Sequence, residues 1–160
     1  MPELEIRVAT EDDVSLILSF IRELAEYERL SHEVVATKEA LRDSLFGERR
    51  VAEVVLGYLG DDPAGFALFF HTFSTFLGKP GIYLEDLFVR PEFRRAGVGR
   101  ALLLHLARLA KERDCGRLEW SVLDWNEPAI GFYKSIGASP VAGWTVYRVT
   151  GEALERLARG

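Results

Sequence analysis

The chain has 160 residues, of which 48% are hydrophobic and 28% are charged, and its formal net charge at pH 7 is −5. This length and composition are ordinary for a soluble globular protein, so we expect one domain over residues 1–160 with a full hydrophobic core. The acidic balance argues against a nucleic-acid partner, because such proteins carry basic surfaces, and it is compatible with a cationic ligand.

The first half of the chain predicts alternating strands and helices. Residues 4–8 alternate as a half-buried strand, and Thr10 with Asp13 caps a helix that ends near Arg29. Residues 37–46 predict a second helix, capped by a threonine and stopped by a glycine. Strands expected at 51–58 and 64–73 flank a tight turn at 60–63, so we expect them to pair antiparallel.

The second half continues the alternation. Residues 82–89 predict the central strand, and a helix over 97–113 carries an apolar stripe that points at a sheet. A fifth strand is expected at 117–123 and a last strand at 145–149. Between them lies a helix that Asn126 caps, with a proline in its first turn and a glycine after its end. The order indicates a mixed α/β fold.

A basic turn with two glycines follows the central strand. Arg94-x-x-Gly97-x-Gly99 opens the helix, and the N–H groups of a helix start together with Arg94, Arg95 and Arg100 favour an anion. A P-loop would need Lys followed by Ser or Thr after the last glycine, and a dinucleotide-binding turn would need a third glycine. Neither pattern is present, whereas a pyrophosphate suits the turn.

This turn resembles motif A of the GNAT acetyltransferases, which holds the pyrophosphate of acetyl-CoA. A second segment supports the resemblance: Asn126-x-x-Ala129, followed by Phe132-Tyr133 and then Gly137-Ala138, closely resembles motif B of that family. The two motifs occur in the family's order and spacing. The resemblance implies a single GNAT-type domain, in which a mixed, mostly antiparallel sheet flanked by helices splays around an acetyl-CoA cleft.

Within this family, the chain resembles the spermidine/spermine N-acetyltransferase branch, which includes a thialysine-preferring relative. Glu23-Leu24-Ala25-x-Tyr27-Glu28, Tyr83-Leu84-Glu85-Asp86-x-Phe88-Val89 and Trp125-Asn126-Glu127-Pro128 carry it. It implies a homodimer that transfers acetyl from acetyl-CoA to a small primary amine. The implied cofactor-binding residues are Leu87, Phe88, Val89, Arg94, Arg95, Ala96, Gly97, Val98, Gly99, Arg100, Asn126 and Tyr133. The implied amine-site residues are Tyr27, Glu28, Glu85, Glu119, Trp120 and Ser121.

The reaction itself suggests roles for two of these residues. An alkyl ammonium with a pKa of about 10.4 must lose a proton before it attacks, at a cost of roughly 4.6 kcal/mol at pH 7. Strand alternation predicts that Glu85 shares a face with Tyr83 and Leu87, so Glu85 is the candidate base, acting through water. Asp86 would then point the other way and be structural. Tyr133 is the candidate proton donor to the leaving thiolate, and the N–H of Leu87 or Val89 could stabilise the oxyanion if the strand is bulged or splayed there.

One departure from the branch bears on the substrate. The polyamine-acetylating members carry acidic residues just before a Gly-Trp pair, whereas this chain has Val141-Ala142-Gly143-Trp144. The change favours a shorter diamine, thialysine or another small amine as the substrate over spermidine and spermine. Two other functions stay open: a protein acetyltransferase acting on a lysine or N-terminal amine, and a non-catalytic acyl-CoA sensor.

Cysteine, histidine and leader patterns give the remaining expectations. The single Cys115 cannot form an internal disulfide, which agrees with a reducing compartment. Residues 1–5 lack the pattern of a signal peptide, and no apolar run is long enough to span a bilayer, so we expect a cytoplasmic protein with no membrane partner. His32, His71 and His105 show no metal-ligand spacing, and we expect no metal.

Overall fold

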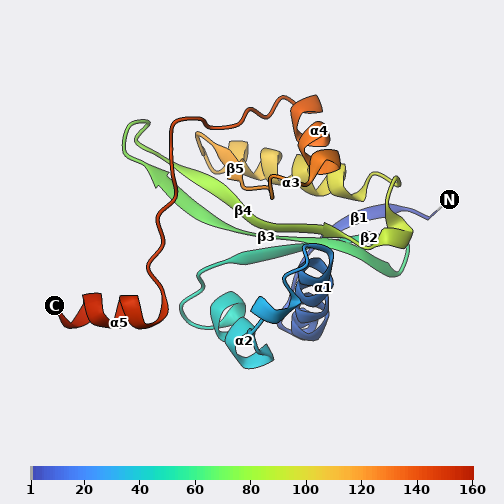
Figure 1. Ribbon diagram of the computed structural model, residues 1–160. Coiled ribbons are helices and arrows are strands. Elements are labelled where there is room, and N and C mark those ends of the chain that lie inside the picture. Colours follow the sequence, from blue (N-terminus) through green and yellow to red (C-terminus); the bar gives the residue numbers. More distant parts are fainter. Residues whose placement is uncertain (1) are drawn as a thin grey trace. The chain divides into compact units, whose positions relative to one another are not determined.

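The computed structural model describes residues 2–160, and the chain divides into two compact units, one up to Leu123 and one over residues 124–160. Met1 lies outside the described residues. The first unit contains a five-stranded sheet in the order β1-β2-β3-β4-β5 (Figure 1). The strands are β1 Leu4–Val8, β2 Glu53–Leu59, β3 Asp62–Ser74, β4 Lys79–Val89 and β5 Leu118–Trp120. All neighbours pair antiparallel except β4 and β5, which are parallel, and this confirms the expected mixed, mostly antiparallel sheet.

Three helices of the first unit cover the two faces of its sheet (Figure 1). α1, Val14–Tyr27, and α2, Lys38–Phe46, lie on one face, and α3, Val98–Glu112, lies on the other. Single 3-10 turns occur at Glu11–Asp13, Ser31–Glu33 and Pro91–Phe93.

The predicted helix caps are present where the sequence places them. The backbone N–H of Thr10 donates to Asp13 Oδ2 at 2.8 Å, although this box opens the 3-10 turn that precedes α1 rather than α1 itself. The hydroxyl of Thr37 accepts from the backbone N–H of Ala40 at 3.1 Å and starts α2. Each cap satisfies N–H groups that a helix start leaves without a partner.

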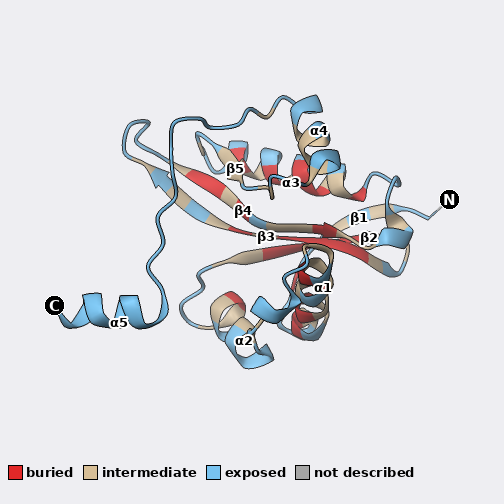
Figure 2. Cartoon of the chain, viewed as in Figure 1, coloured by how far each residue is buried: buried red, intermediate tan, exposed pale blue. Residues whose placement is uncertain are grey.

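Apolar side chains on the two faces of the sheet form the core of the first unit (Figure 2). On the α1 face, the rings of Phe20 and Phe66 stack with their centroids 5.2 Å apart, and Phe88 of β4 joins the same cluster. α3 buries its predicted apolar stripe, including Leu102 and Leu106, against the other face. Because Phe88 and α3 both pack into the core, the C-terminal end of β4 and the turn that follows it are held firmly.

A partly buried ion pair ties α1 to the end of β4. The guanidinium of Arg90 donates to both carboxylate oxygens of Glu23, at 3.0 Å each, and to the carbonyl of Pro63 at 3.2 Å. It also lies 4.5 Å from the centre of the Phe20 ring. Burial raises the pKa of Glu23, but the hydrogen bonds from Arg90 and Ser19 outweigh burial and hold it below its usual range. These contacts fix the C-terminal end of α1 relative to β4.

The second unit contains α4, Glu127–Ser135, and α5, Gly151–Arg159. The side chain of Asn126 accepts from the N–H of Ala129 at 3.4 Å and caps α4, as the sequence predicts. The last predicted strand was wrong, because residues 145–149 pair with no strand in the described chain. A strand exists only by hydrogen bonding to a neighbour, so strand-forming residues alone do not make one. The helix α5 is not among the elements predicted from the sequence.

The fifth strand is shorter than predicted. We expected it over 117–123, but its pairing with β4 ends at Trp120, opposite Leu84. The reason lies in β4, whose register against β3 shifts at the next residue. A bulge bends its strand and increases the local twist, so β4 diverges from the line of β5 beyond this point.

Candidate active site

The divergence of β4 from β5 leaves one edge of β4 open. β5 pairs with β4 only at Ile82, Tyr83 and Leu84, whereas β4 continues to Val89. Within the first unit, the last residues of β4 therefore have a strand neighbour only on the β3 side. The sheet is splayed at this point, as the resemblance implied.

The open edge presents the backbone groups of two predicted cofactor-binding residues. The N–H of Arg90 donates to the carbonyl of Ala64 at 2.8 Å, so in this antiparallel ladder Arg90 and Phe88 face β3. Leu87 and Val89 alternate with them and direct their N–H and C=O groups to the opposite, open edge. These groups can pair with an extended amide chain, and the N–H of Leu87 can donate to an oxyanion.

Glu85 is the extra residue of a β-bulge. Leu84 pairs with Phe69 and Asp86 with Leu68, which leaves Glu85 without an opposite residue on β3. The expectation that Glu85 shares a face with both Tyr83 and Leu87 was therefore wrong. Tyr83 pairs with Phe70, and Leu87 pairs with Ala67. Phe70 and Ala67 are three residues apart on β3, so their side chains point to opposite faces of the sheet. The same therefore holds for Tyr83 and Leu87.

Asp86 is the most perturbed carboxyl group of the described chain. Burial raises its pKa from the ordinary 3.8 to about 6, and the nearby charges of Glu85 and Glu28 add to the increase. Burial also raises the pKa of Glu28, at the C-terminal end of α1. Glu85 and Glu28 thus lie near enough to Asp86 for their charges to act on it, and the three carboxyl groups together can attract a cation or accept its proton.

Plain strand alternation predicts a structural role for Asp86, because it directs this side chain away from that of Glu85. The bulge cancels that argument, since it places Asp86 opposite Leu68, whose side chain packs against the α1-side core. The electrostatic influence of Glu28 on Asp86 shows that this carboxyl lies near the end of α1. The adjacent acidic residues Glu85 and Asp86 in a strand indicate that two carboxyl groups lie close together. No pattern in the sequence, however, predicts the bulge at Glu85.

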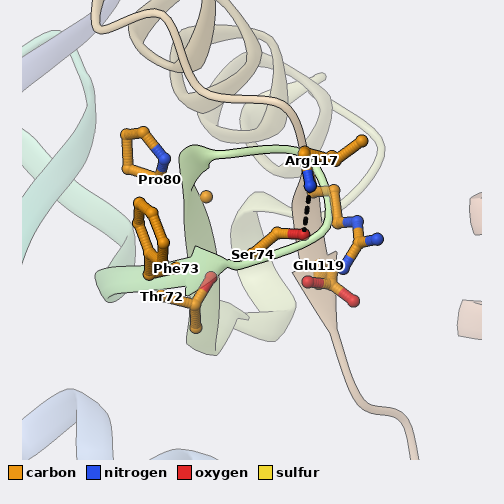
Figure 3. Close-up of a pocket in the computed structure, with 8 residues that line it drawn as sticks. Thr72, Phe73, Ser74, Pro80, Arg117 and Glu119 are labelled. Atoms are coloured by element: carbon orange, nitrogen blue, oxygen red, sulfur yellow. Dashed lines mark hydrogen bonds between the residues drawn. The ribbon is translucent and has the colours of Figure 1, made fainter.

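The three amine-site residues expected from β5 and its extension have different surroundings. The hydroxyl groups of Ser121 and Tyr83 are 2.6 Å apart and hydrogen bonded, next to the last β4–β5 pair. Trp120 pairs in the ladder with Leu84. Glu119 lines a cavity of about 70 Å³ at the tip of the β3–β4 hairpin, where Leu77 donates its N–H to the hydroxyl of Ser74 at 3.1 Å (Figure 3). That cavity is much smaller than the roughly 300–1,000 Å³ of ordinary ligand sites.

The predicted phosphate turn has the backbone of an anion site. Arg95 and Gly97 both adopt left-handed conformations, with φ of 70° and 84°. The first helical bond of α3 runs from the N–H of Ala101 to the carbonyl of Gly97 at 2.9 Å, so the preceding N–H groups have no acceptor within the helix. The first turn of α3 contains no acidic residue, and Arg100 within it is exposed. These features fit the pyrophosphate of acetyl-CoA.

Arg94 lies between the turn and α1. Its Nε donates to the carbonyl of Val89 at 3.0 Å. Its guanidinium carbon is 5.0 Å from the centre of the Tyr27 ring and 5.7 Å from that of Phe88. One side chain thus contacts the open edge of β4 and a predicted amine-site residue.

Tyr133 and Asn126 belong to the second unit. Tyr133 lies within α4, and Asn126 caps it. Their approach to the residues of β4 stays a prediction. In the described residues, no group of three or more His, Cys, Asp or Glu side chains could hold a metal ion. None of the helices described is long and apolar enough to cross a membrane.

Comparison with known proteins decides the family. The model of the acetyltransferase (GNAT) family matches residues 18–138, which cross the boundary between the two units. The chain belongs to the GNAT acetyltransferase family. It is therefore an acyltransferase, and the acetyl donor of the family is acetyl-CoA.

Individual relatives agree with this assignment over almost the whole chain. Thialysine N-epsilon-acetyltransferase of Caenorhabditis elegans is 38% identical over 99% of both chains. L-ornithine N5-acetyltransferase of Arabidopsis thaliana is 34% identical over 95% of this chain and 86% of its own. Among solved structures, an integron cassette protein of Vibrio cholerae has a TM-score of 0.81 and 32% identity, with 98% of each chain covered. The resemblance to the branch with the thialysine-preferring relative is confirmed.

Proposed function

We propose that this GNAT enzyme transfers the acetyl group of acetyl-CoA to the terminal primary amine of a short, doubly aminated substrate such as thialysine, ornithine or a diamine. The observation that carries the proposal is the buried Asp86 of β4, on which the charges of Glu28 and Glu85 act. The proposal is supported by the relatives, which are named for thialysine and ornithine. Both compounds carry an amine at the end of a short chain and a second amino group.

The number of carboxyl groups favours a substrate with two amino groups. Glu85 and Glu28 each lie close enough to Asp86 to raise its pKa, so the negative charge of each repels that of Asp86. A cation placed among them relieves this repulsion, and two ammonium groups relieve it more than one. We therefore propose that one carboxylate serves the reacting amine and that another pairs with the second ammonium.

Deprotonation of the amine is the first chemical requirement. An alkyl ammonium with a pKa of about 10.4 holds its proton at pH 7, and a base with a pKa near the working pH accepts that proton most effectively. The pKa of Asp86, at about 6, meets this condition, and burial is its main cause. We propose that Asp86 shares this role with Glu85, the base expected from the sequence, through water.

The remaining steps follow from the bonds that change. The neutral amine attacks the thioester carbonyl carbon in a ternary complex, and the N–H of Leu87 at the open edge stabilises the oxyanion. When the carbon–sulfur bond breaks, the proton of Tyr133 goes to the sulfur, and Tyr133 recovers a proton from the acetylated nitrogen through water. The products are the N-acetyl amine and CoA with a free thiol.

Thiol release from acetyl-CoA with a panel of amines tests this function. The panel contains thialysine, ornithine, lysine, putrescine, spermidine, spermine and a lysine-containing peptide, and mass spectrometry identifies the acetylated product. We expect turnover with a short, doubly aminated compound and a loss of about 100-fold or more in kcat for Tyr133→Phe. Turnover with the peptide alone would make the enzyme a protein acetyltransferase. Binding of acetyl-CoA without any turnover would make it a sensor.

We further propose that two copies of the chain assemble as a homodimer. Six of the seven residues in 144–150 are β-branched or aromatic, which favours a strand, and Trp144 and Tyr147 are 83% and 92% exposed. Strand-forming residues with large exposed aromatic side chains are typical of an interface. A cytoplasmic location also stays a proposal, supported by the single Cys115.

A further inference from the structure

Arg94 is the side chain that joins the phosphate turn to the amine site. Its Nε is engaged by the carbonyl of Val89, on the open edge of β4, at 3.0 Å. One side of its guanidinium lies near the Tyr27 ring, at the end of α1, with 5.0 Å between the guanidinium carbon and the ring centre. Arg94 is therefore oriented by two groups that lie on different elements.

These contacts leave the two Nη groups of the Arg94 guanidinium available to a ligand. Among residues 2–160, the structure places no hydrogen bond on the two Nη groups of Arg94, and the side chain is exposed. Two Nη groups in one plane form a bidentate pair with a phosphate, and a phosphate can therefore bind without displacing the contacts to Val89 and Tyr27.

We propose that Tyr27 is a positioning residue for the cofactor: its ring holds the guanidinium of Arg94 in the orientation that binds the pyrophosphate of acetyl-CoA. The inference rests on the proposed function, because it takes the turn after β4 as the pyrophosphate site. It adds that a side chain of the amine site sets the affinity for the cofactor. The two substrate sites are thereby coupled through one arginine.

The coupling has a definite size and direction. Removing the ring frees Arg94 to adopt other rotamers, which must then be frozen again when the phosphate binds. An arginine–aromatic contact at an exposed site corresponds to about a 2- to 5-fold change in a binding constant. Tyr27→Leu should weaken CoA binding by this factor, while Tyr27→Phe, which keeps the ring, should bind CoA like the wild type.

Isothermal titration calorimetry with CoA as the probe tests the inference on the full chain. A matched control is Tyr58→Leu, because Tyr58 of β2 stacks with Arg7 at 4.0 Å and so loses the same kind of contact away from the turn. We expect the Kd for CoA to rise about 2- to 5-fold in Tyr27→Leu and to stay unchanged in Tyr58→Leu. In an Arg94→Lys background, Tyr27→Leu should have no further effect, because the planar group that the ring orients is gone.

Each outcome separates the inference from the function on which it rests. A wild-type chain that does not bind CoA would overturn both. An unchanged Kd in Tyr27→Leu, or an equal loss in the presence and absence of Arg94, would overturn the coupling alone. If Tyr27→Leu does not fold, the reciprocal binding measurement decides: Arg94→Lys should raise the Kd for the amine about 2- to 5-fold in the presence of saturating CoA, and an unchanged Kd would overturn the coupling.

Discussion

At the scale of single residues, Asp86 dominates the account because its environment disfavours its own charge. Burial is the main cause of its raised pKa, and Glu85 and Glu28 increase it further. A carboxyl group in such a position costs stability whenever it is ionised, and carboxyl groups of this kind are frequent at functional sites. A bound ammonium group would compensate that cost directly.

The first prediction concerns the pH dependence of stability. Asp86 has a pKa of 3.8 in an unfolded chain and about 6 in the folded one. Well below pH 3.8 it is protonated in both states, and as the pH rises from about 3.8 through about 6 the folded state loses up to roughly 3 kcal/mol of stability, at about 1.36 kcal/mol per pKa unit. Asp86→Asn removes this loss. We therefore expect the free energy of unfolding of Asp86→Asn, measured in urea, to exceed that of the wild type at pH 7. The excess should be smaller at pH 4.

Glu85→Gln serves as the matched control for that measurement. It removes one of the two charges that act on Asp86 and keeps the burial, so it should give a smaller gain of the same sign. The stability gain of Asp86→Asn over the wild type should be larger at pH 7 than at pH 4. An equal gain at the two pH values would contradict the electrostatic description of the site.

The residues of the candidate site were only partly readable from the sequence. Glu85, Glu28 and Tyr27 could be selected because the motifs that contain them resemble those of a known branch. Asp86 could not be selected, because its role depends on a bulge of one residue, and a single-residue shift moves side chains to the other face. Strand alternation is therefore a reliable guide only until the register changes.

At the scale of elements, the approach of β3 to β4 at Gly65 supports the open edge. A Cβ at Gly65 would lie 2.5 Å from the carbonyl oxygen of Phe88, a backbone atom that cannot turn aside. Gly65 faces Val89 across the ladder, so any displacement would reach the carbonyl that Arg94 binds. The glycine thus allows the close packing of the two strands.

The second prediction compares two glycine substitutions. Gly65→Ala should destabilise the chain by about 1–3 kcal/mol and weaken CoA binding, because β4 must move. Gly131 lies inside α4 with nothing within 4 Å of an added Cβ, so Gly131→Ala should be neutral or stabilise by up to about 1 kcal/mol. Thermal unfolding of both variants checks the difference, and equal effects would contradict the packing at Gly65.

The strands β1 to β4 and the starts of two helices were predicted from local patterns, whereas the length of β5, the state of residues 145–149 and the helix α5 were not. The starts of α2 and α4 follow from Thr37 and Asn126, whose side chains cap their own helices. The extent of β5 and the fate of residues 145–149 depend on which strand lies alongside, and no local pattern contains that information.

At the scale of the whole molecule, the third prediction concerns assembly. If residues 144–149 form a dimer contact, light scattering after gel filtration should give twice the mass of one chain for the wild type. The double variant Trp144→Ala with Tyr147→Ala should shift toward the monomer, because it removes two large exposed aromatic side chains. The matched control is Phe76→Ala at the β3–β4 hairpin, where the side chain is 98% exposed. A monomeric wild type would contradict the proposed dimer.

We propose above that the carboxyl groups of Glu28, Glu85 and Asp86 select a substrate with a second charged amino group. The most direct test compares kcat/KM for thialysine with that for 3-(2-aminoethylthio)propanoic acid, which keeps the reacting end and the carboxylate and lacks only the second amine. We expect a preference for thialysine of about tenfold or more in the wild type, equivalent to about 1.4 kcal/mol, and a smaller preference in Glu28→Gln. Equal values for the two amines, or a preference that Glu28→Gln leaves unchanged, would contradict it.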